Sequence, residues 1–263
     1  MAGTTLVKDV LWRASVLLGD HKPTQFIRWS EREMVQWLDD AQLAILKYLP
    51  ATGSRIDAIK LKPGSRQSIE LIDPDDVKPG DGSTPFDPVY GMEVLDVIRN
   101  MGQDGQTPGP AISDAVDRRM LDAQNRNWHN VIGQRVINIV HDPRNRQYFY
   151  VYPNVTGGWV EVSYTARPSP IPNTGTSGAP LYAYDGSSTL RISLGSEWVE
   201  DIVNYICARA KLKHSEVNGD GQGAMLYTQL FLASLNAAVA AMTGNNINLK
   251  RLPLAPDPVG AAS

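Results

Sequence analysis

Proline is distributed unevenly along this chain of 263 residues. Of its 18 prolines, 14 lie from Pro50 to Pro180, and none lies between Pro180 and Pro253. Proline breaks helix interiors and is confined to the edges and turns of sheets. The two flanks can therefore form long helices, whereas the middle of the chain favours short strands and loops. The expected order is helices, then strands, then helices, then a C-terminal tail.

Two helices are predicted on the N-terminal side of Pro50. Apolar residues recur at helical spacing from Thr5 to Leu18, and Gly19 follows as a stop signal. The second helix is predicted to begin after Ser30, because Ser30 and Glu33 have the spacing of a capping box. Its apolar stripe continues until Pro50 ends it.

A helical hairpin is predicted on the other flank. Ser196 is expected to cap a helix that ends near Lys211, Lys213 and His214, whose charges suit the negative C-terminal pole. Residues 218–221 are rich in Gly and Asn and predict a turn, after which a second helix runs to about Met242. The residues from Gly244 onward contain three prolines and are expected to form an extended arm.

Five segments between the flanks alternate apolar with polar residues and are rich in Val, Ile and Tyr, as strands are. They are QSIEL (67–71), VLDVIRN (94–100), RVINIVHD (135–142), QYFYVYP (147–153) and WVEVSYTARP (159–168). A mostly antiparallel sheet is predicted, in which the last two segments pair as a hairpin through residues 154–158. Two loops, at about 73–90 and 169–185, exceed normal loop lengths.

These elements predict an α+β fold. The helices from both ends of the chain meet as one bundle, and an antiparallel β-rich domain projects from it as an insertion. The expected boundaries are 1–50 for the N-terminal helices, 51–192 for the inserted domain with its long loops, 193–243 for the helical hairpin that completes the bundle, and 244–263 for the extended arm.

Charge and cysteine content exclude several classes of protein. With 25 Lys and Arg against 28 Asp and Glu, the net charge of -3 argues against broad non-specific binding to nucleic acid. A single cysteine, Cys207, allows neither an internal disulfide nor a cysteine-based metal site. Charged residues interrupt the N-terminal apolar pattern, which argues against a signal peptide, and no window of about 18 apolar residues is expected to span a membrane.

Motifs for catalysis or metal binding are not found in the sequence. The phosphate-loop patterns are missing, and His21, His129, His141 and His214 lack the spacing of metal ligands. Residues 218–223 resemble a calcium loop superficially, but Gln229 stands where the bidentate Glu is needed. We therefore predict no catalytic residue, no cofactor and no metal, and we expect Cys207 to lie in the core.

Basic and aromatic residues alternate at 28–29, 126–129 and 144–150. Such residues anchor protein interfaces and can also stack on nucleic acid. Two alternatives from other classes stay open. One is a hydrolase that uses Cys207 or His129 with a nearby acid. The other is a module that binds single-stranded nucleic acid through Trp128, Tyr148 and Tyr150.

A further set of segments is distinctive in its order and spacing over most of residues 1–240. The set comprises FIRWSEREMVQWLDDAQLAILKYLP (26–50), GSRQSIEL (64–71), VLDVIRNMG (94–102), DRRMLDAQNRNWHN (117–130), HDPRNRQYFYVYP (141–153), VEVSYTARP (160–168) and the final helical hairpin. Together they resemble the head-to-tail adaptor proteins of short-tailed bacteriophages. The resemblance implies a structural virion protein, not an enzyme, that forms a dodecameric ring beneath the portal and above the tail nozzle. A tail-completion protein or another virion ring protein is the nearest alternative.

The resemblance also implies partners and places for particular residues. The partners are the portal protein, the tail nozzle or tail tube protein, further copies of the chain, and genomic DNA that passes through the channel without sequence-specific binding; no membrane is involved. The location is the virion neck, with the host cytoplasm during assembly. We expect the arm to bind the portal through Leu249, Lys250, Arg251, Leu252 and Leu254. The expected nozzle-facing residues are Arg144, Asn145, Arg146 and Asn154, and the expected channel-lining residues are Asp73, Asp75, Asp76, Asp81 and Asp87.

Overall fold

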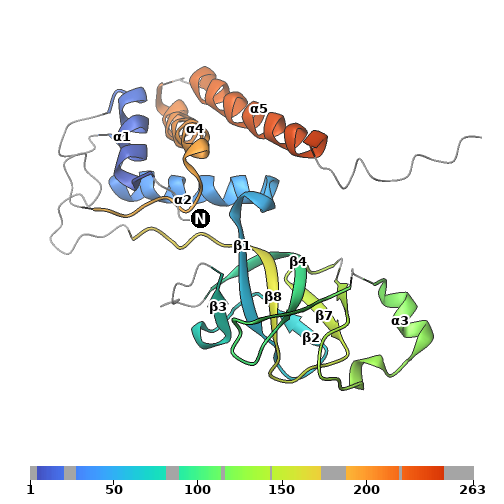
Figure 1. The fold of residues 1–263 in the computed structure, drawn as a ribbon. Helices are drawn as coiled ribbons and strands as arrows, with labels where there is room; N and C mark the ends of the chain where they lie inside the picture. The colour runs from blue at the N-terminus through green and yellow to red at the C-terminus, as the bar shows by residue number, and fades with distance from the viewer. Residues whose placement is uncertain are drawn as a thin grey trace, which may run out of the picture.

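The structure, a computed structural model, describes residues 5–20, 28–80, 89–113, 116–142, 144–172, 188–218 and 221–245. The elements run in the order α1 (Val7–Leu17), α2 (Glu31–Tyr48), β1 (Ser54–Lys60), β2 (Arg66–Ser68), β3 (Val77–Pro79), β4 (Gly91–Met101), β5 (Pro108–Ala111), α3 (Arg118–Gln124), β6 (Asn138–His141), β7 (Tyr148–Tyr152), β8 (Trp159–Ala166), α4 (Val199–Asn218) and α5 (Gly221–Asn245). The fold is α+β, as the sequence predicts. The helices from both ends of the chain lie together, and the strands lie beside them (Figure 1).

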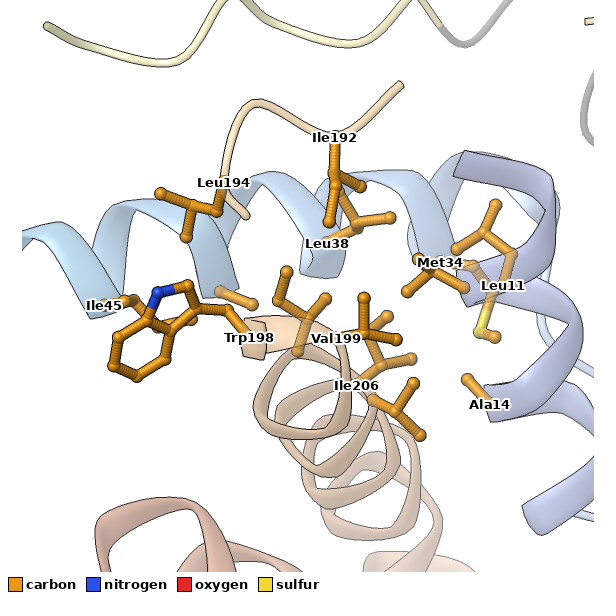
Figure 2. Packing of buried hydrophobic residues seen from close by; sticks show 14 of the residues in the cluster. Leu11, Ala14, Met34, Leu38, Ile45, Ile192, Leu194, Trp198, Val199 and Ile206 are labelled. Atoms are coloured by element: carbon orange, nitrogen blue, oxygen red, sulfur yellow. The ribbon is translucent and has the colours of Figure 1, made fainter. Parts of the chain in front are cut away.

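Helix α4 is the centre of the helical part, because α1, α2 and α5 all pack against it (Figure 1). The shared core includes fully buried Leu11, Leu38 and Ile206, from α1, α2 and α4. Ile192 belongs to the segment that leads from the sheets into α4, and it closes this core from above (Figure 2). Residues far apart in the sequence therefore depend on one another for burial.

The starts and ends of the first two helices follow the local signals. Ser30 Oγ accepts a hydrogen bond from the Glu33 amide at 3.3 Å, and Glu33 Oε2 accepts one from the Ser30 amide at 3.3 Å. The predicted capping box is thus confirmed. Helix α1 ends at Leu17, and Gly19 takes a φ of 65°, the left-handed conformation that glycine adopts easily after a helix.

Helix α4 differs from its predicted bounds at both ends. A 3₁₀ turn occupies Ser196–Trp198, and α4 begins at Val199, so Ser196 is not its cap. The helix continues to Asn218, past the predicted end near His214, because no proline or glycine interrupts it before Gly219. Lys213 therefore does not serve the C-terminal pole. It forms an ion pair with Glu33 in the first turn of α2.

Helix α5 continues past Met242 and through Gly244 to Asn245, so the extended conformation predicted from Gly244 begins too early. Of the predicted turn between the two helices, Asn218 belongs to α4 and Gly221 to α5. Gly219 and Asp220 lie outside the described residues, as does most of the predicted arm.

Within the described residues the strands form two antiparallel sheets instead of the single predicted sheet. The larger has the order β3-β1-β8-β4-β5, and the smaller has the order β2-β7-β6. Strands β1, β3 and β5 were not predicted. Strands β3 and β5 contain prolines and lie at the two edges of the larger sheet, where a missing backbone donor is tolerated. The predicted 73–90 loop contains β3, and its residues 81–88 lie outside the described part, as do residues 173–187 of the second long loop.

The predicted hairpin between β7 and β8 is wrong. Strand β7 pairs with β6 and β2, whereas β8 pairs with β1 and β4 in the other sheet. The chain crosses between the sheets at residues 154–158, where the Asn154 amide donates to Val131 O at 2.8 Å and Gly157 has a φ of 73°. The crossing places Phe149 and Val151 of β7 in one core with Val160 and Val162 of β8. Burying both apolar faces favours two stacked sheets over one flat hairpin.

The turn before β7 has its predicted signals. The Arg144 amide donates to Asp142 Oδ1 at 3.0 Å, and the Gln147 amide donates to Asn145 Oδ1 at 3.1 Å. These short side-chain bonds are typical of Asx turns. The turn joins β6 to β7, which form the hairpin actually present.

Helix α2 holds the segments that lead from the sheets to the helices. The Ile171 amide donates to Asp39 Oδ2 at 3.1 Å, and the Ser193 amide donates to Gln42 Oε1 at 2.7 Å. Thr165 Oγ1, near the end of β8, donates to Pro50 O at 2.9 Å. Two side chains one helical turn apart thus bind two places on the chain that returns from β8 to α4.

The carboxyl group of Asp39 makes its contact with the Ile171 amide sensitive to pH. Burial raises the pKa of the Asp39 carboxyl to about 6 from its usual 3.8, although the Ile171 amide opposes the shift. The folded state therefore takes up a proton at a higher pH than the unfolded chain does. The resulting stabilisation is complete below the unfolded pKa and is lost as pH rises through about 6.

We expect Asp39→Asn to be more stable than the parent at pH 7.5, by about 1 kcal/mol after allowance for partial exposure. The amide oxygen still accepts from Ile171 and carries no charge to desolvate. The advantage is expected to shrink as the pH falls to 5. Urea unfolding at both pH values measures it, and an advantage that grows on acidification would contradict the assigned cause.

Candidate interaction surfaces

Cys207 is unsuited to nucleophilic chemistry. The residue is fully buried in the helical core, as predicted, and Sγ lies 3.9 Å from Ala14 O. Burial raises the pKa of its thiol to about 12. Since the thiolate is the nucleophilic form, the thiol is unreactive at neutral pH.

His129 lies beside the hydroxyl of Ser65, but the two residues lack the surroundings of a catalytic pair. Its Nδ1 lies 2.9 Å from Ser65 Oγ, but Ser65 is buried, and burial lowers the pKa of the imidazole. The imidazole stacks on Trp128 with ring centroids 3.6 Å apart. Cavities of about 350, 300 and 220 Å³ occur elsewhere, and none of the three is lined by Ser65, His129 or Cys207. The contact is best explained as packing of this loop on the smaller sheet.

Metal-ligating side chains do not converge in the part of the chain that the structure describes. No group there of three or more His, Cys, Asp or Glu is placed to hold a metal ion. The largest of the three cavities lies between the helices and the larger sheet, and its charged lining residues are Arg55, Arg167 and Arg191.

The aromatic platform expected for single-stranded nucleic acid is not assembled. Trp128 is fully buried, and its Nε1 donates to Asp122 Oδ1 at 2.8 Å, so its faces cannot receive a base. Tyr148 and Tyr150 point to the other side of β7 from Phe149, and arginine side chains lie over both rings. The guanidinium of Arg66 is 4.1 Å from the Tyr148 centroid. These rings are engaged in intramolecular cation–π contacts.

The structure separates the expected nozzle-facing residues into two groups. Arg144, Asn145 and Arg146 precede β7, and Arg146 Nη1 forms an ion pair with Glu93 Oε2 at 3.1 Å. Gln147, the next residue, donates to Gly91 O at the end of β4 that lies beside the end of β8. This end of the sheets is the one nearer the helices. The three residues therefore do not lie at a distal tip.

Asn154 follows β7 and lies at its opposite end. Its backbone bridges to Ile132, whose side chain is 78% exposed. The distal surface formed by Asn154 and Ile132 was only half predicted, because Ile132 belongs to no strand or motif.

The expected channel-lining acids are partly described. Asp73 caps a 3₁₀ turn by accepting from the Asp75 amide at 3.1 Å, and both carboxylates are exposed. Asp76 pairs with Lys60 Nζ at 3.8 Å. Asp81 and Asp87 lie outside the described residues. The expected portal-binding residues, Leu249, Lys250, Arg251, Leu252 and Leu254, lie outside them as well.

Helix α5 carries an exposed apolar surface that the sequence analysis missed. Met225, Leu226 and Leu230 are 64%, 54% and 46% exposed, and Leu232, Val239 and Met242 are also exposed. The sequence contains a signal for this surface, since no charged residue occurs between Asp220 and Lys250.

Residues Gly221–Met242 are long and apolar enough to cross a membrane by length and composition, and only 11% of that window is buried. The expectation concerned a run of apolar residues, and Gln, Thr, Ser and Asn interrupt this stretch; because they add no charge, its mean hydropathy stays high.

The fold and these surfaces together point to a class of protein. Among the described residues, the prominent features are interaction surfaces, and the candidate catalytic groups are buried or engaged in packing. Exposed apolar surfaces of this kind are typical of proteins that assemble with other molecules. The family model of the SU10 adaptor protein matches residues 5–251. The chain therefore belongs to the SU10 adaptor family and is a structural adaptor protein of a bacteriophage. A search of curated proteins finds no match.

Proposed function

We propose that this chain is a head-to-tail adaptor that forms a dodecameric ring between the portal and the tail nozzle. Its family, matched over residues 5–251, carries the proposal. The structure supports it through a two-part build, in which a helical part and a pair of sheets are joined by chain segments bound to α2. Two separate parts offer two separate surfaces, as a protein between two partners requires.

Each of the predicted domains has a part in this proposed role. Residues 1–50 and 193–243 form the ring-building part, residues 51–192 project towards the nozzle, and the arm beyond α5 reaches the portal. The distal surface of Asn154 and Ile132 is the better-supported nozzle contact, because a largely exposed isoleucine at a projecting end suits a protein interface. Arg144, Asn145 and Arg146 are a weaker proposal for the same contact, since they lie at the end nearer the helices.

We assign the DNA channel to the side bearing Asp73, Asp75 and Asp76, and Asp81 of the same prediction lies outside the described residues. Exposed carboxylates repel phosphate, and the chain has a net charge of -3, so DNA would pass without being gripped. No sequence-specific contact with DNA is part of this proposal.

Light scattering tests the central proposal with the full chain and the matching portal ring. The protein alone is expected to be a monomer, and the mixture is expected to gain about twelve copies per portal ring, as matching cyclic symmetry requires. Binding of the chain to the tail tube but not to the portal would favour the alternative function, that of a tail-completion protein. A monomer that ignores both partners would overturn the proposal.

The arm is the proposed portal anchor. Deleting residues 246–263, which begin after the last residue of α5, is expected to leave the helical content unchanged and to abolish addition to the portal ring. Each arm contributes weakly, but about twelve tethered arms act together through effective concentration. Circular dichroism and light scattering measure the two effects.

A matched control keeps the arm's length while replacing Leu249, Leu252 and Leu254 by Ser. This variant is expected to lose portal binding as the deletion does, which would assign the binding to side chains and not to chain length. Unchanged joining by the truncated protein would refute the role of the arm.

A further inference from the structure

Three arginines line the cavity of about 350 Å³ at the junction between the helices and the larger sheet. Arg55 belongs to β1, Arg167 directly follows β8, and Arg191 lies in the segment that leads into α4. Among the described residues, no Asp or Glu lines this cavity. In a chain with more acidic than basic residues, three arginines around one cavity form a local positive patch.

Two carboxylates lie near these arginines without lining the cavity. Asp57 Oδ2 is 3.4 Å from Arg55 Nε, so Arg55 is partly neutralised. Arg167 acts on Asp39, because burial raises the pKa of that carboxyl and the charge of Arg167 opposes the shift. Both carboxylates already accept hydrogen bonds within the fold. They offset part of the positive charge, but neither occupies the space that the arginines line.

The rest of the lining indicates the kind of ligand that the cavity would take. Its volume of about 350 Å³ is roughly that of twelve water molecules, so a single small anion would leave most of it unfilled. The hydroxyl groups of Ser54, Ser169 and Ser193 can donate to or accept from a peptide backbone. Leu46 and Leu194 are buried and also line the cavity, so part of its wall is apolar. This mixture suits a short peptide that carries acidic and apolar side chains.

Duplex DNA is a poorer fit for the cavity. Strong binding to a duplex requires several phosphate contacts spread along a surface. Here the arginines gather in one cavity, and the chain as a whole has a net charge of -3.

We propose that this cavity binds an acidic segment of a partner protein, with Arg55, Arg167 and Arg191 holding its carboxylates. Arginine suits this task, because its planar guanidinium can pair with a carboxylate through two parallel hydrogen bonds. Two of the arginines belong to the sheet side, and the third belongs to the segment that enters α4. One bound segment would therefore contact both parts of the fold. The inference does not rest on the proposed ring or on the portal.

A synthetic peptide of alternating Glu and Leu, labelled with a neutral fluorophore, tests the inference on the full chain. Fluorescence anisotropy is expected to show saturable binding. The matched peptide of alternating Gln and Leu is expected to bind at least tenfold more weakly. Because the peptide binds the folded state, an excess of it is expected to raise the midpoint of thermal unfolding. Equal binding of the two peptides, or no saturable binding of the Glu peptide at about 1 mM, would overturn the inference.

A pair of substitutions assigns the binding to the cavity. Arg167 and Arg191 are exposed, so Arg167→Gln/Arg191→Gln is expected to keep the helical content of the parent and to bind the Glu peptide at least tenfold more weakly. If circular dichroism shows a loss of helix, Arg167→Gln alone is used, with an expected weakening of at least threefold.

The matched control is Arg119→Gln/Arg126→Gln. It removes the same charge from exposed positions that do not line the cavity, and it is expected to bind as the parent does. Equal weakening by the two double variants would assign the binding to net charge and would refute the inference.

Competition separates the other possible occupants. Inorganic phosphate and a double-stranded DNA oligonucleotide are each expected to displace the labelled peptide less effectively than the unlabelled Glu peptide does. Displacement by either one at a tenfold lower concentration would overturn the inference in favour of a phosphate ligand. Because no portal is present, failure of this test leaves the adaptor proposal standing, and failure to join the portal leaves this inference standing.

Discussion

Asp57→Ala is expected to lower the free energy of unfolding by about 3 kcal/mol, near the upper end for leaving a buried hydrogen-bonding group without its partner. Asp57 is buried on β1 and accepts from the Tyr164 hydroxyl at 2.6 Å and from the Gly80 amide at 3.2 Å. Alanine leaves the fully buried Tyr164 hydroxyl without this acceptor. It also removes the carboxylate that pairs with Arg55 at 3.4 Å. Chemical denaturation followed by circular dichroism measures the loss.

Tyr164→Phe is the matched comparison, because it removes the donor and leaves the carboxylate with Arg55 and Gly80. A smaller loss of about 1–2 kcal/mol is expected. The double variant is expected to lose less than the sum of the two single losses, since both remove the same hydrogen bond. If Asp57→Ala proves no more destabilising than Tyr164→Phe, the carboxylate does not organise this part of the core.

Leu38→Ala is expected to lower the free energy of unfolding by about 2–5 kcal/mol. Leu38 is fully buried in the core shared by α1, α2 and α4, and Ile192 lies over it (Figure 2). Its removal leaves a cavity bounded by residues from both ends of the chain. The helical part has no core without those contacts. The loss of stability therefore affects the part that is proposed to build the ring. Denaturant midpoints measure the effect.

Leu17→Ala serves as the control on the same helical part. Leu17 is 49% exposed, so its truncation is expected to change stability by less than about 0.5 kcal/mol. Comparable losses for the two leucines would contradict the burial assigned to Leu38.

The local signals of the sequence predicted the helices well. Ser30 and Glu33 form the capping box, and Gly19 follows α1 in the left-handed conformation. These features depend on residues within one or two turns, so local spacing is sufficient to identify them. The end of α4 was wrong for a complementary reason. Basic residues near a helix terminus are a weak signal, and Lys213 pairs with Glu33 of a distant helix.

Strand existence was easier to predict than strand partners. The segments of β4, β6, β7 and β8 were identified from alternation, because alternate burial leaves a pattern in one strand by itself. Alternation does not say which strand lies alongside. Proximity in sequence favoured pairing β7 with β8, yet the two lie in different sheets. Edge strands β3 and β5 carry prolines and few apolar residues, so they left no pattern to find.

For the candidate surfaces as well, the sequence showed the composition and only the structure showed which residues are exposed. The uncharged stretch of α5 is visible in the sequence, but only the packing of α5 on α4 shows which of its residues stay exposed. Trp128 has the composition of a stacking residue, and only the fold shows that it is fully buried. Likewise, Arg146 and Asn154 are close in sequence and lie at opposite ends of a strand.

The sequence by itself determined that helices flank a β-rich middle, the capping box of α2, the α+β class and the resemblance to phage adaptors. These properties follow from proline placement, periodicity and short-range hydrogen bonding, which act within a few residues of the chain. The tertiary structure alone decided that two sheets stack, that both ends of the chain share one core around α4, and that the outer side of α5 remains uncovered. Those outcomes depend on which distant apolar faces can be buried together, and that choice is made by the whole chain.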